Sequence, residues 1–322
     1  MQILIIKPSS MGDILHALPV AQSIRDQIPD AQISWVVKTR FADLIRRCDT
    51  VNGRIIEFRH ELGLRGIWQT CRDLTRLRFD AVLDFQGLLR SGLMTRAANA
   101  PLKIGPPWSR ECSNWFHPQV ADFPAHGQQS HVIEMMLQFL PLLGLQPELR
   151  SPVTIRGDDP AEADARLRNC RPIVLFPNSR NEQREWKFFP KLTVRLADAF
   201  PNETFAWDSH RPWESPAVGS PERFINLTAK TSLMQLVNLI QNAKLIVSND
   251  SGPVHMAAAF GTPTVGLYGP TCPERTGPYP VDGVRNQALV APGKDLQRLS
   301  VDAVFECVAN RLTALNSARR AA

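Results

Sequence analysis

The 322-residue chain lacks long hydrophobic runs and has only six cysteines. No apolar stretch approaches the roughly 20 residues of a membrane-spanning helix, which argues against an integral membrane protein. The cysteines are scattered, without a C-x-x-C pair or a metal-ligand spacing, so we expect free thiols in a reducing compartment. Residues 1–6 already have strand-like sequence, without the basic segment and cleavage site of a signal peptide. These absences predict a cytoplasmic protein.

Acidic residues are fewer than basic ones: 31 Asp and Glu stand against 37 Lys and Arg, for a formal net charge of +6. The surplus is concentrated between residues 40 and 110, where thirteen Lys or Arg accompany seven Asp or Glu. This stretch lacks the interleaved aromatic residues that stack on bases, so we expect no nucleic-acid partner. Its arginines fit either a solvated helix surface or the recognition of phosphates and carboxylates, and the sequence leaves both interpretations open.

Short apolar segments alternate with segments of helical spacing in both halves of the chain. Strands are expected at 3–6, 33–37, 54–58, 81–85, 173–176, 204–207, 224–226, 245–247 and 264–268, and helices at 17–27, 41–48, 64–77, 88–98, 131–143, 190–199, 232–242, 252–260 and about 301–315. This alternation predicts an α/β protein with parallel βαβ units in two Rossmann-like domains, 1–150 and 151–322. We expect a linker within 146–160, irregular structure over 99–127, and a final helix able to pack back on the N-terminal domain.

A polar turn follows the first predicted strand and reads Lys7-Pro-Ser-Ser-Met-Gly-Asp13-Ile-Leu-His16. Asp13 fits two roles at this position. It could cap the helix that follows, or it could act as a general base that deprotonates an acceptor hydroxyl. Ser9, Ser10 and the backbone N–H groups after them are candidates to orient an acceptor or to hold a phosphate.

A second turn, in the C-terminal half, reads Val247-Ser-Asn-Asp250-Ser-Gly252-Pro-Val-His255. Asp250 is expected to cap a helix that begins near Pro253. Small residues at 251 and 252 let the backbone approach a diphosphate closely, and His255 lies one turn into the helix at the same mouth. The next strand ends in Tyr-Gly-Pro-Thr at 268–271, at the same edge of the sheet.

A third polar segment, Pro177-Asn-Ser-Arg-Asn-Glu-Gln-Arg184-Glu-Trp186, follows the strand expected at 173–176. Its hydroxyl, amide and guanidinium groups suit phosphate oxygens, but a surface loop anchored by Trp186 explains it equally well. These segments contain no D-x-D sequence and no His/Asp cluster with metal spacing. Neutralisation of a leaving diphosphate by N–H groups, Arg184 and a helix dipole therefore fits better than a metal ion.

Taken together, the chain resembles the ADP-heptose:lipopolysaccharide heptosyltransferases (glycosyltransferase family 9), and most closely the type I enzymes. The resemblance rests on Lys7-x-Ser-Ser-Met-Gly-Asp13-x-Leu-His16, Asp84-x-Gln-Gly-Leu-x-x-Ser91, Asp250-x-Gly-x-x-His255 and Tyr268-Gly-Pro-Thr271, in this order over nearly the whole chain. It implies a GT-B fold with two Rossmann-like domains facing a cleft, and inverting transfer without a metal ion or other cofactor.

The resemblance also implies roles for particular residues. Asp13 would be the general base, and the donor ADP-heptose (ADP-L-glycero-D-manno-heptose) would bind to the C-terminal domain through Ser179, Arg180, Arg184, Glu214, Asp250, Ser251, Gly252 and His255. The acceptor Kdo-lipid A would bind through Lys7, Ser9, Ser10, Gly12, Arg59, Arg90 and Arg110. Because that acceptor is a membrane lipid, the protein is expected at the inner face of the inner membrane. Its oligomeric state is left open.

Two departures from the family pattern leave alternatives open. Arg184-Glu185-Trp186 stands where the family has Lys, then a basic or polar residue, then Trp, and Arg does not simply replace Lys. The Gly-rich strand end with its nucleoside-binding Glu is replaced by Trp-Asp-Ser-His-Arg-Pro-Trp-Glu at 207–214, so Asp208 or Glu214 could take the ribose. Transfer of another sugar or to another glycan remains an alternative, as does a non-catalytic nucleotide-binding protein. A nicotinamide-dependent dehydrogenase is disfavoured because no G-x-G-x-x-G follows the first strand.

Overall fold

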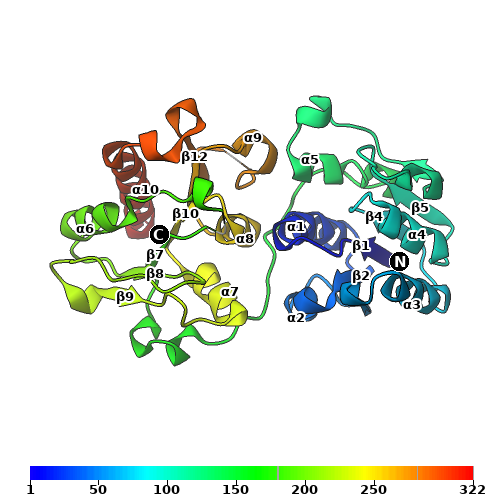
Figure 1. Cartoon of the computed structure of the whole chain (residues 1–322), viewed down its shortest axis with the longest axis horizontal. Coiled ribbons are helices and arrows are strands. Elements are labelled where there is room, and N and C mark those ends of the chain that lie inside the picture. Colours follow the sequence, from blue (N-terminus) through cyan, green and yellow to red (C-terminus); the bar gives the residue numbers. More distant parts are fainter. Residues whose placement is uncertain (180, 281, 322) are drawn as a thin grey trace. The chain divides into compact units, whose positions relative to one another are not determined.

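A computed structural model describes residues 1–179, 181–280 and 282–321. The chain divides into two compact units, Met1–Arg156 and Gly157–Ala322, and each contains one six-stranded parallel sheet (Figure 1). The two sheets confirm the α/β class expected from the alternating pattern.

The first unit is built around β1, which lies in the middle of its sheet. The strand order is β3-β2-β1-β4-β5-β6. The strands are β1 Gln2–Ile6, β2 Gln32–Lys38, β3 Ile55–Phe58, β4 Ala81–Asp84, β5 Leu102–Gly105 and β6 Gln119–Val120, and the helices are α1 Met11–Gln27, α2 Ala42–Arg46, α3 Leu64–Thr75, α4 Leu89–Ala97 and α5 Val132–Leu137. The 3-10 helices are η1 Thr39–Phe41, η2 His60–Leu62, η3 Ser113–Phe116, η4 Gly127–Gln129 and η5 Pro141–Leu143. Apolar residues fill β1 because both faces of a parallel sheet are covered.

Helices α3 and α4 share one hydrophobic core with the sheet. Leu4 and Ile6 are two residues apart on β1, so their side chains lie on the same face of the sheet. They pack with Leu74 of α3 and Met94 of α4. All four side chains are fully buried. These helices therefore each bury one side against the sheet and leave the other side for solvent or a partner.

The second unit repeats the architecture with the strand order β12-β11-β10-β7-β8-β9. The strands are β7 Ile173–Phe176, β8 Phe205–Trp207, β9 Phe224–Asn226, β10 Leu245–Asn249, β11 Thr264–Tyr268 and β12 Asn286–Val290, and the helices are α6 Phe189–Ala199, α7 Leu233–Asn242, α8 Gly252–Phe260, α9 Pro273–Thr276 and α10 Val301–Ala321. The 3-10 helices are η6 Pro160–Glu162, η7 Ala165–Leu167, η8 Glu182–Arg184, η9 Pro221–Arg223, η10 Pro292–Lys294 and η11 Leu296–Arg298. The final helix α10 packs against α6, and its Val304, Val308 and Leu312 belong to the core of this unit.

The division between the units falls later than the boundary at 150/151 expected from the sequence. The N–H of Asp49 donates to the Thr154 carbonyl at 3.1 Å, and the N–H of Arg156 donates to the Arg47 carbonyl at 2.8 Å. These bonds hold residues 151–156 to the first unit, so the connection is shorter than the expected linker.

Several elements differ from the expectation. The helix expected over 131–143 ends at Leu137 and is followed by η5, because Pro141 has no N–H to continue an α-helix. Gly144 then ends the segment in the left-handed conformation. Residues 99–127 were expected to be irregular but include the strands β5 and β6. The strand β12, in the second unit, was not predicted from the sequence. Strands of two to five residues between turns carry too little alternation to be recognised from sequence.

Candidate functional site

Asp13 lies at the carboxyl end of the central strand β1, in the first turn of α1. The N-cap of this helix is Ser10, so the alternative that Asp13 itself caps the helix is wrong. The Asp13 carboxylate instead completes a capping box: its Oδ2 accepts hydrogen bonds from the Ser10 N–H at 2.8 Å and from the Ser10 hydroxyl at 2.9 Å. Two short bonds to one oxygen fix the orientation of the carboxylate at the sheet edge where α/β proteins bind ligands.

Lys7 connects the ends of β1 and β4. Its Nζ donates to the Phe85 carbonyl at 2.9 Å, and the residue is only 8% exposed. Burial lowers the pKa of Lys7, whereas the charges of Asp13 and Asp84 act in the opposite direction. The ammonium group is thus directed into the protein, near two carboxylates. Of the other expected acceptor residues in this turn, Ser9 is buried, Ser10 is exposed and Gly12 is half-buried in the first turn of α1.

A buried pair, Asp84 and His117, supports the turn after β4. His117 Nε2 lies 2.9 Å from Asp84 Oδ2, and both side chains are fully buried. Asp84 Oδ1 accepts from the N–H groups of Gln86 at 2.9 Å and Gly87 at 3.1 Å. A Cβ at Gly105 would lie 2.2 Å from the His117 ring, so the ring uses space that only glycine leaves. Sequence reasoning missed His117 because it falls in the segment expected to be irregular.

Four basic side chains, from the ends of β2 and β3 and the first turn of α4, interact electrostatically. Burial and then the charges of Arg90 and Arg40 lower the pKa of Lys38. The charge of Lys38, followed by burial and the charge of Arg90, lowers the pKa of His60. We call Lys38, Arg40, His60 and Arg90 the basic cluster. Its positive potential suits a carboxylate or phosphate.

Only Arg90 of this cluster was predicted from the sequence. Lys38 is the last residue of β2 and His60 follows β3 by two residues. Their positions at the carboxyl ends of strands could have identified them from the sequence as candidate binding residues. The other two predicted arginines, Arg59 and Arg110, are not among the charges that shift the pKa values of Lys38 and His60. Arg59 is exposed at the start of η2, and Arg110 is exposed with its N–H bonded to the Gly87 carbonyl at 2.9 Å.

In the second unit, Asp250 follows β10 and is the centre of an ion-pair cluster. Its Oδ2 lies 3.0 Å from Arg184 NH1, and its Oδ1 lies 3.5 Å from His255 Nε2. The Asp250 side chain is only 4% exposed. Burial alone would raise the pKa of Asp250, but His255, the Thr271 hydroxyl and the charge of Arg184 together lower it. The structure thus brings three predicted donor residues together around an ionised carboxylate.

The helix α8 begins beside this cluster. Its N-cap is Ser251 and its first residue is Gly252, so the prediction that Asp250 caps the helix is wrong. The Ser251 hydroxyl lies 3.2 Å from that of Ser248. The first N–H groups of α8 have no partner within the helix, which makes this end suitable for an anion.

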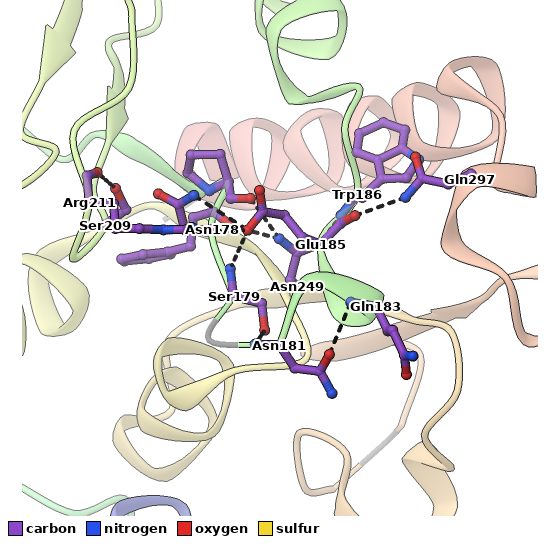
Figure 2. A network of polar contacts seen from close by, with 12 residues as sticks. Asn178, Ser179, Asn181, Gln183, Glu185, Trp186, Ser209, Arg211, Asn249 and Gln297 are labelled. Carbon is purple, nitrogen blue, oxygen red and sulfur yellow. Dashed lines mark hydrogen bonds and ion pairs between the residues drawn. The ribbon is translucent and has the colours of Figure 1, made fainter.

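The loop after β7 is organised around the carboxylate of Glu185 (Figure 2). Its Oε2 accepts from the Ser179 N–H at 3.2 Å, from Asn178 Nδ2 at 3.4 Å and from Arg211 NH2 at 2.9 Å. The Trp186 N–H donates to Asn249 Oδ1 at 3.0 Å, which ties the loop to the end of β10. The fully buried Trp186 ring confirms the anchoring role expected for it. Sequence reasoning noted Glu185 only as a departure and missed its organising role.

Three further donor predictions have different outcomes in the structure. Ser179 is buried within this loop, and its hydroxyl accepts from the Asn181 N–H at 3.4 Å. Arg180 lies outside the described residues. Glu214 is exposed, whereas Asp208 at the end of β8 is buried and receives a hydrogen bond from Thr231 at 2.8 Å. Burial raises the pKa of Asp208 to about 7, against the opposing effect of Thr231 and the Ser209 N–H.

A cavity of about 670 Å³ opens beside the Glu185 loop. Its lining includes Glu182, Glu185, Lys187, Arg211 and Lys294. Charges of both signs line it, and it lets water reach one side of the loop.

Within residues 1–179, 181–280 and 282–321, no group of three or more His, Cys, Asp and Glu side chains is arranged to hold a metal ion. None of the helices in the same ranges combines the length and the apolar character needed to span a bilayer.

Comparison with known proteins gives a consistent result. The model of glycosyltransferase family 9 (heptosyltransferase) matches residues 67–300. The lipopolysaccharide core heptosyltransferase OpsX of Haemophilus influenzae is 28% identical over 85% of this chain and 81% of its own length. Lipopolysaccharide heptosyltransferase 1 of Escherichia coli K12 is 28% identical over 95% of this chain and 98% of its own length.

Solved structures agree. The E. coli heptosyltransferase WaaC with ADP superimposes with a TM-score of 0.76 at 27% identity, covering 97% of this chain and all of the other. WaaC with ADP-2-deoxy-2-fluoro heptose gives 0.73 at 26% identity, covering 96% of this chain and 99% of the other. The GT-B fold class expected from the sequence is confirmed. Because the family model covers most of the chain, this protein belongs to glycosyltransferase family 9, the heptosyltransferases.

Proposed function

We propose that this protein is an inverting heptosyltransferase that moves heptose from ADP-L-glycero-D-manno-heptose to a Kdo-lipid A acceptor, with Asp13 as the general base. The observation that carries the proposal is the Asp13 carboxylate, oriented by Ser10 at 2.8 and 2.9 Å at the carboxyl end of β1. An oriented carboxylate at a ligand-binding sheet edge is what proton removal from an acceptor hydroxyl requires. The family membership and the ADP-heptose analogue bound by a relative support the choice of donor.

The reaction would proceed by a single displacement. The acceptor hydroxyl gives its proton to Asp13 as its oxygen bonds to the anomeric carbon of the heptose. The bond from that carbon to the diphosphate breaks, ADP leaves, and the configuration at the anomeric carbon inverts. The α8 N-terminus and Arg184 would stabilise the negative charge that develops on the diphosphate. Asp250, ionised and nearly buried, would accept hydrogen bonds from the sugar hydroxyls.

The basic cluster supports an anionic acceptor. Lys38, Arg40, His60 and Arg90 influence one another electrostatically at the carboxyl edge of the first sheet, the same edge as Asp13. A Kdo carboxylate or a lipid A phosphate would relieve their mutual repulsion. Because such an acceptor resides in a membrane, we also propose that the protein works at the inner face of the inner membrane.

The decisive test is ADP release by the purified protein supplied with ADP-heptose and Kdo-lipid A. We expect acceptor-dependent release in the native protein and a loss of about 10²–10⁴-fold in Asp13→Asn, the range typical of a removed general base. Ser10→Ala is the matched control, because it removes a hydroxyl that orients Asp13 but keeps the base. It should lose far less activity than Asp13→Asn.

Calorimetric titration with ADP separates the alternatives. Unchanged ADP affinity in an inactive Asp13→Asn would agree with a purely catalytic role. ADP binding without turnover in the native protein would favour another sugar or acceptor, or a non-catalytic nucleotide-binding protein. An Asp13→Asn variant with native activity would refute the assignment of the base.

A further inference from the structure

The first unit exposes apolar side chains on three neighbouring segments. Leu64 and Trp68 on α3 are 84% and 60% exposed, and Trp115 on η3 is 78% exposed. Leu89 and Leu93 on α4 are exposed to smaller extents. Helix α4 contacts both α3 and η3, so these side chains belong to adjacent parts of one layer.

The exposure follows from the helical geometry. Leu64 and Trp68 are four residues apart on α3, as are Leu89 and Leu93 on α4, so each pair lies along one side of its helix. Leu74 and Met94, elsewhere on the same two helices, are buried in the core against the sheet. Each helix therefore buries some of its side chains against the sheet and exposes large apolar ones at its surface.

Arginines flank the exposed apolar side chains. Between residues 59 and 116 the chain has nine Lys or Arg and five Asp or Glu, and one of the five, Asp84, is buried against His117. The guanidinium of Arg72 lies 5.0 Å from the centre of the Trp68 ring. We use the term apolar–arginine surface for a set that combines large apolar and basic side chains: Leu64, Arg65, Trp68, Arg72, Arg76, Leu89, Leu93, Arg96 and Trp115, all exposed.

We propose that the apolar–arginine surface binds the anionic surface of a lipid bilayer, with Leu64, Trp68 and Trp115 entering the headgroup region. Tryptophan is favoured at this depth because its ring is apolar and its N–H is polar. Arginine places its aliphatic part along the apolar region and its charge at the phosphates. An interfacial surface with apolar residues between basic ones binds through both contributions.

The inference deepens the proposed function, since it places the acceptor's membrane against a defined face, but it can fail separately. Vesicle binding requires neither ADP-heptose nor Kdo-lipid A. Each basic residue near an anionic membrane contributes about five-fold to binding. The arginine contribution therefore depends on salt, whereas the apolar contribution does not.

The test is co-sedimentation of the full chain with vesicles of phosphatidylglycerol and phosphatidylethanolamine, compared with vesicles of phosphatidylcholine. We expect preference for the anionic vesicles and quenching of tryptophan fluorescence by brominated acyl chains. The triple variant Arg65→Gln, Arg72→Gln, Arg76→Gln should weaken binding about 100-fold at low salt. The triple variant Leu64→Ser, Trp68→Ala, Trp115→Ala should weaken it about ten-fold or more at low and high salt alike.

Val284→Ser with Val290→Ser is the matched control, because it removes exposed apolar residues from the second unit. Equal vesicle binding by the native protein and both triple variants would overturn the inference. A concentration-dependent dimer that only the apolar variant abolishes would also overturn it, since a second copy would then be the occupant. The variants should keep native ADP release with a deacylated, water-soluble acceptor. Loss of that activity would instead make the surface part of the acceptor site.

Discussion

Glu185 offers a sharp test of how the donor loop is held together. Glu185→Ala removes the acceptor of the buried Ser179 N–H and of Arg211. An unsatisfied buried N–H costs about 1–3 kcal/mol, whereas a pair with a half-exposed arginine adds at most about 1 kcal/mol. Water from the adjoining cavity of about 670 Å³ can replace part of the lost bonding. We therefore expect a destabilisation of about 2 kcal/mol.

Scanning calorimetry of the full chain measures this effect, because it can resolve the melting of the two units. For a unit of 150–250 residues, about 2 kcal/mol corresponds to a decrease in Tm of roughly 4–8 °C. ADP affinity should fall as well, since the loop carries Ser179 and Arg184. Glu185→Gln keeps an acceptor oxygen and should lose about half as much stability.

Glu182→Ala is the control for the Glu185 variants. It removes the same charge from an exposed position in the same loop. A Tm decrease as large as that of Glu185→Ala would mean that net charge, rather than the hydrogen bonds of Glu185, stabilises the loop. An unchanged Tm and ADP affinity in Glu185→Ala would refute the reasoning outright.

Three further outcomes are expected. His117→Ala should destabilise the first unit by about 3 kcal/mol in urea unfolding, because it leaves a cavity and removes the buried partner of Asp84; a loss below about 1 kcal/mol would contradict the role given to the pair. Burial raises the pKa of Asp208 from 3.8 to about 7, so between these values the folded protein holds a proton that the unfolded chain releases. The free energy of unfolding should therefore decrease by up to about 4 kcal/mol as the pH rises from about 4 to about 7. Asp208→Asn should flatten this part of the stability profile, and parallel profiles for the native protein and the variant would exclude the effect. Gly66→Ala would place a Cβ 2.1 Å from the Arg59 carbonyl oxygen, so α3 must shift, and thermal unfolding should show a loss of about 1–3 kcal/mol rather than the gain that alanine gives in an unhindered helix.

The elements that carry strong local patterns could be predicted from the sequence. The apolar runs of β1, β7 and β10 and the small residues that begin α8 express backbone preferences of a few adjacent residues. The capping relation of Ser10 and Asp13 is also local, although of the two roles considered for Asp13 the helix cap belongs to Ser10. Such features need no knowledge of the rest of the chain.

Contacts between distant residues could not be predicted in the same way. His117 and Asp84 are 33 positions apart, and nothing local to either marks them as partners. Arg184 and Asp250 are 66 positions apart, and each was expected at the donor site for a separate reason. Their direct contact depends on the order of strands in the sheet, which brings the ends of β7 and β10 side by side.

The contact between Arg184 and Asp250 has a consequence for how the two parts of a sugar nucleotide are sensed. If the diphosphate of a bound sugar nucleotide draws the Arg184 guanidinium away, Asp250 loses one of its hydrogen-bond donors. The hydroxyls of the sugar can replace that donor, whereas ADP alone cannot. Binding of the phosphate and of the sugar would therefore be thermodynamically coupled through one exchange of partners. After transfer, the bound ADP has no sugar to donate hydrogen bonds to Asp250. Re-formation of the 3.0 Å contact between Arg184 and Asp250 would therefore favour the release of ADP. The ion pair would then act as a built-in competitor that distinguishes substrate from product.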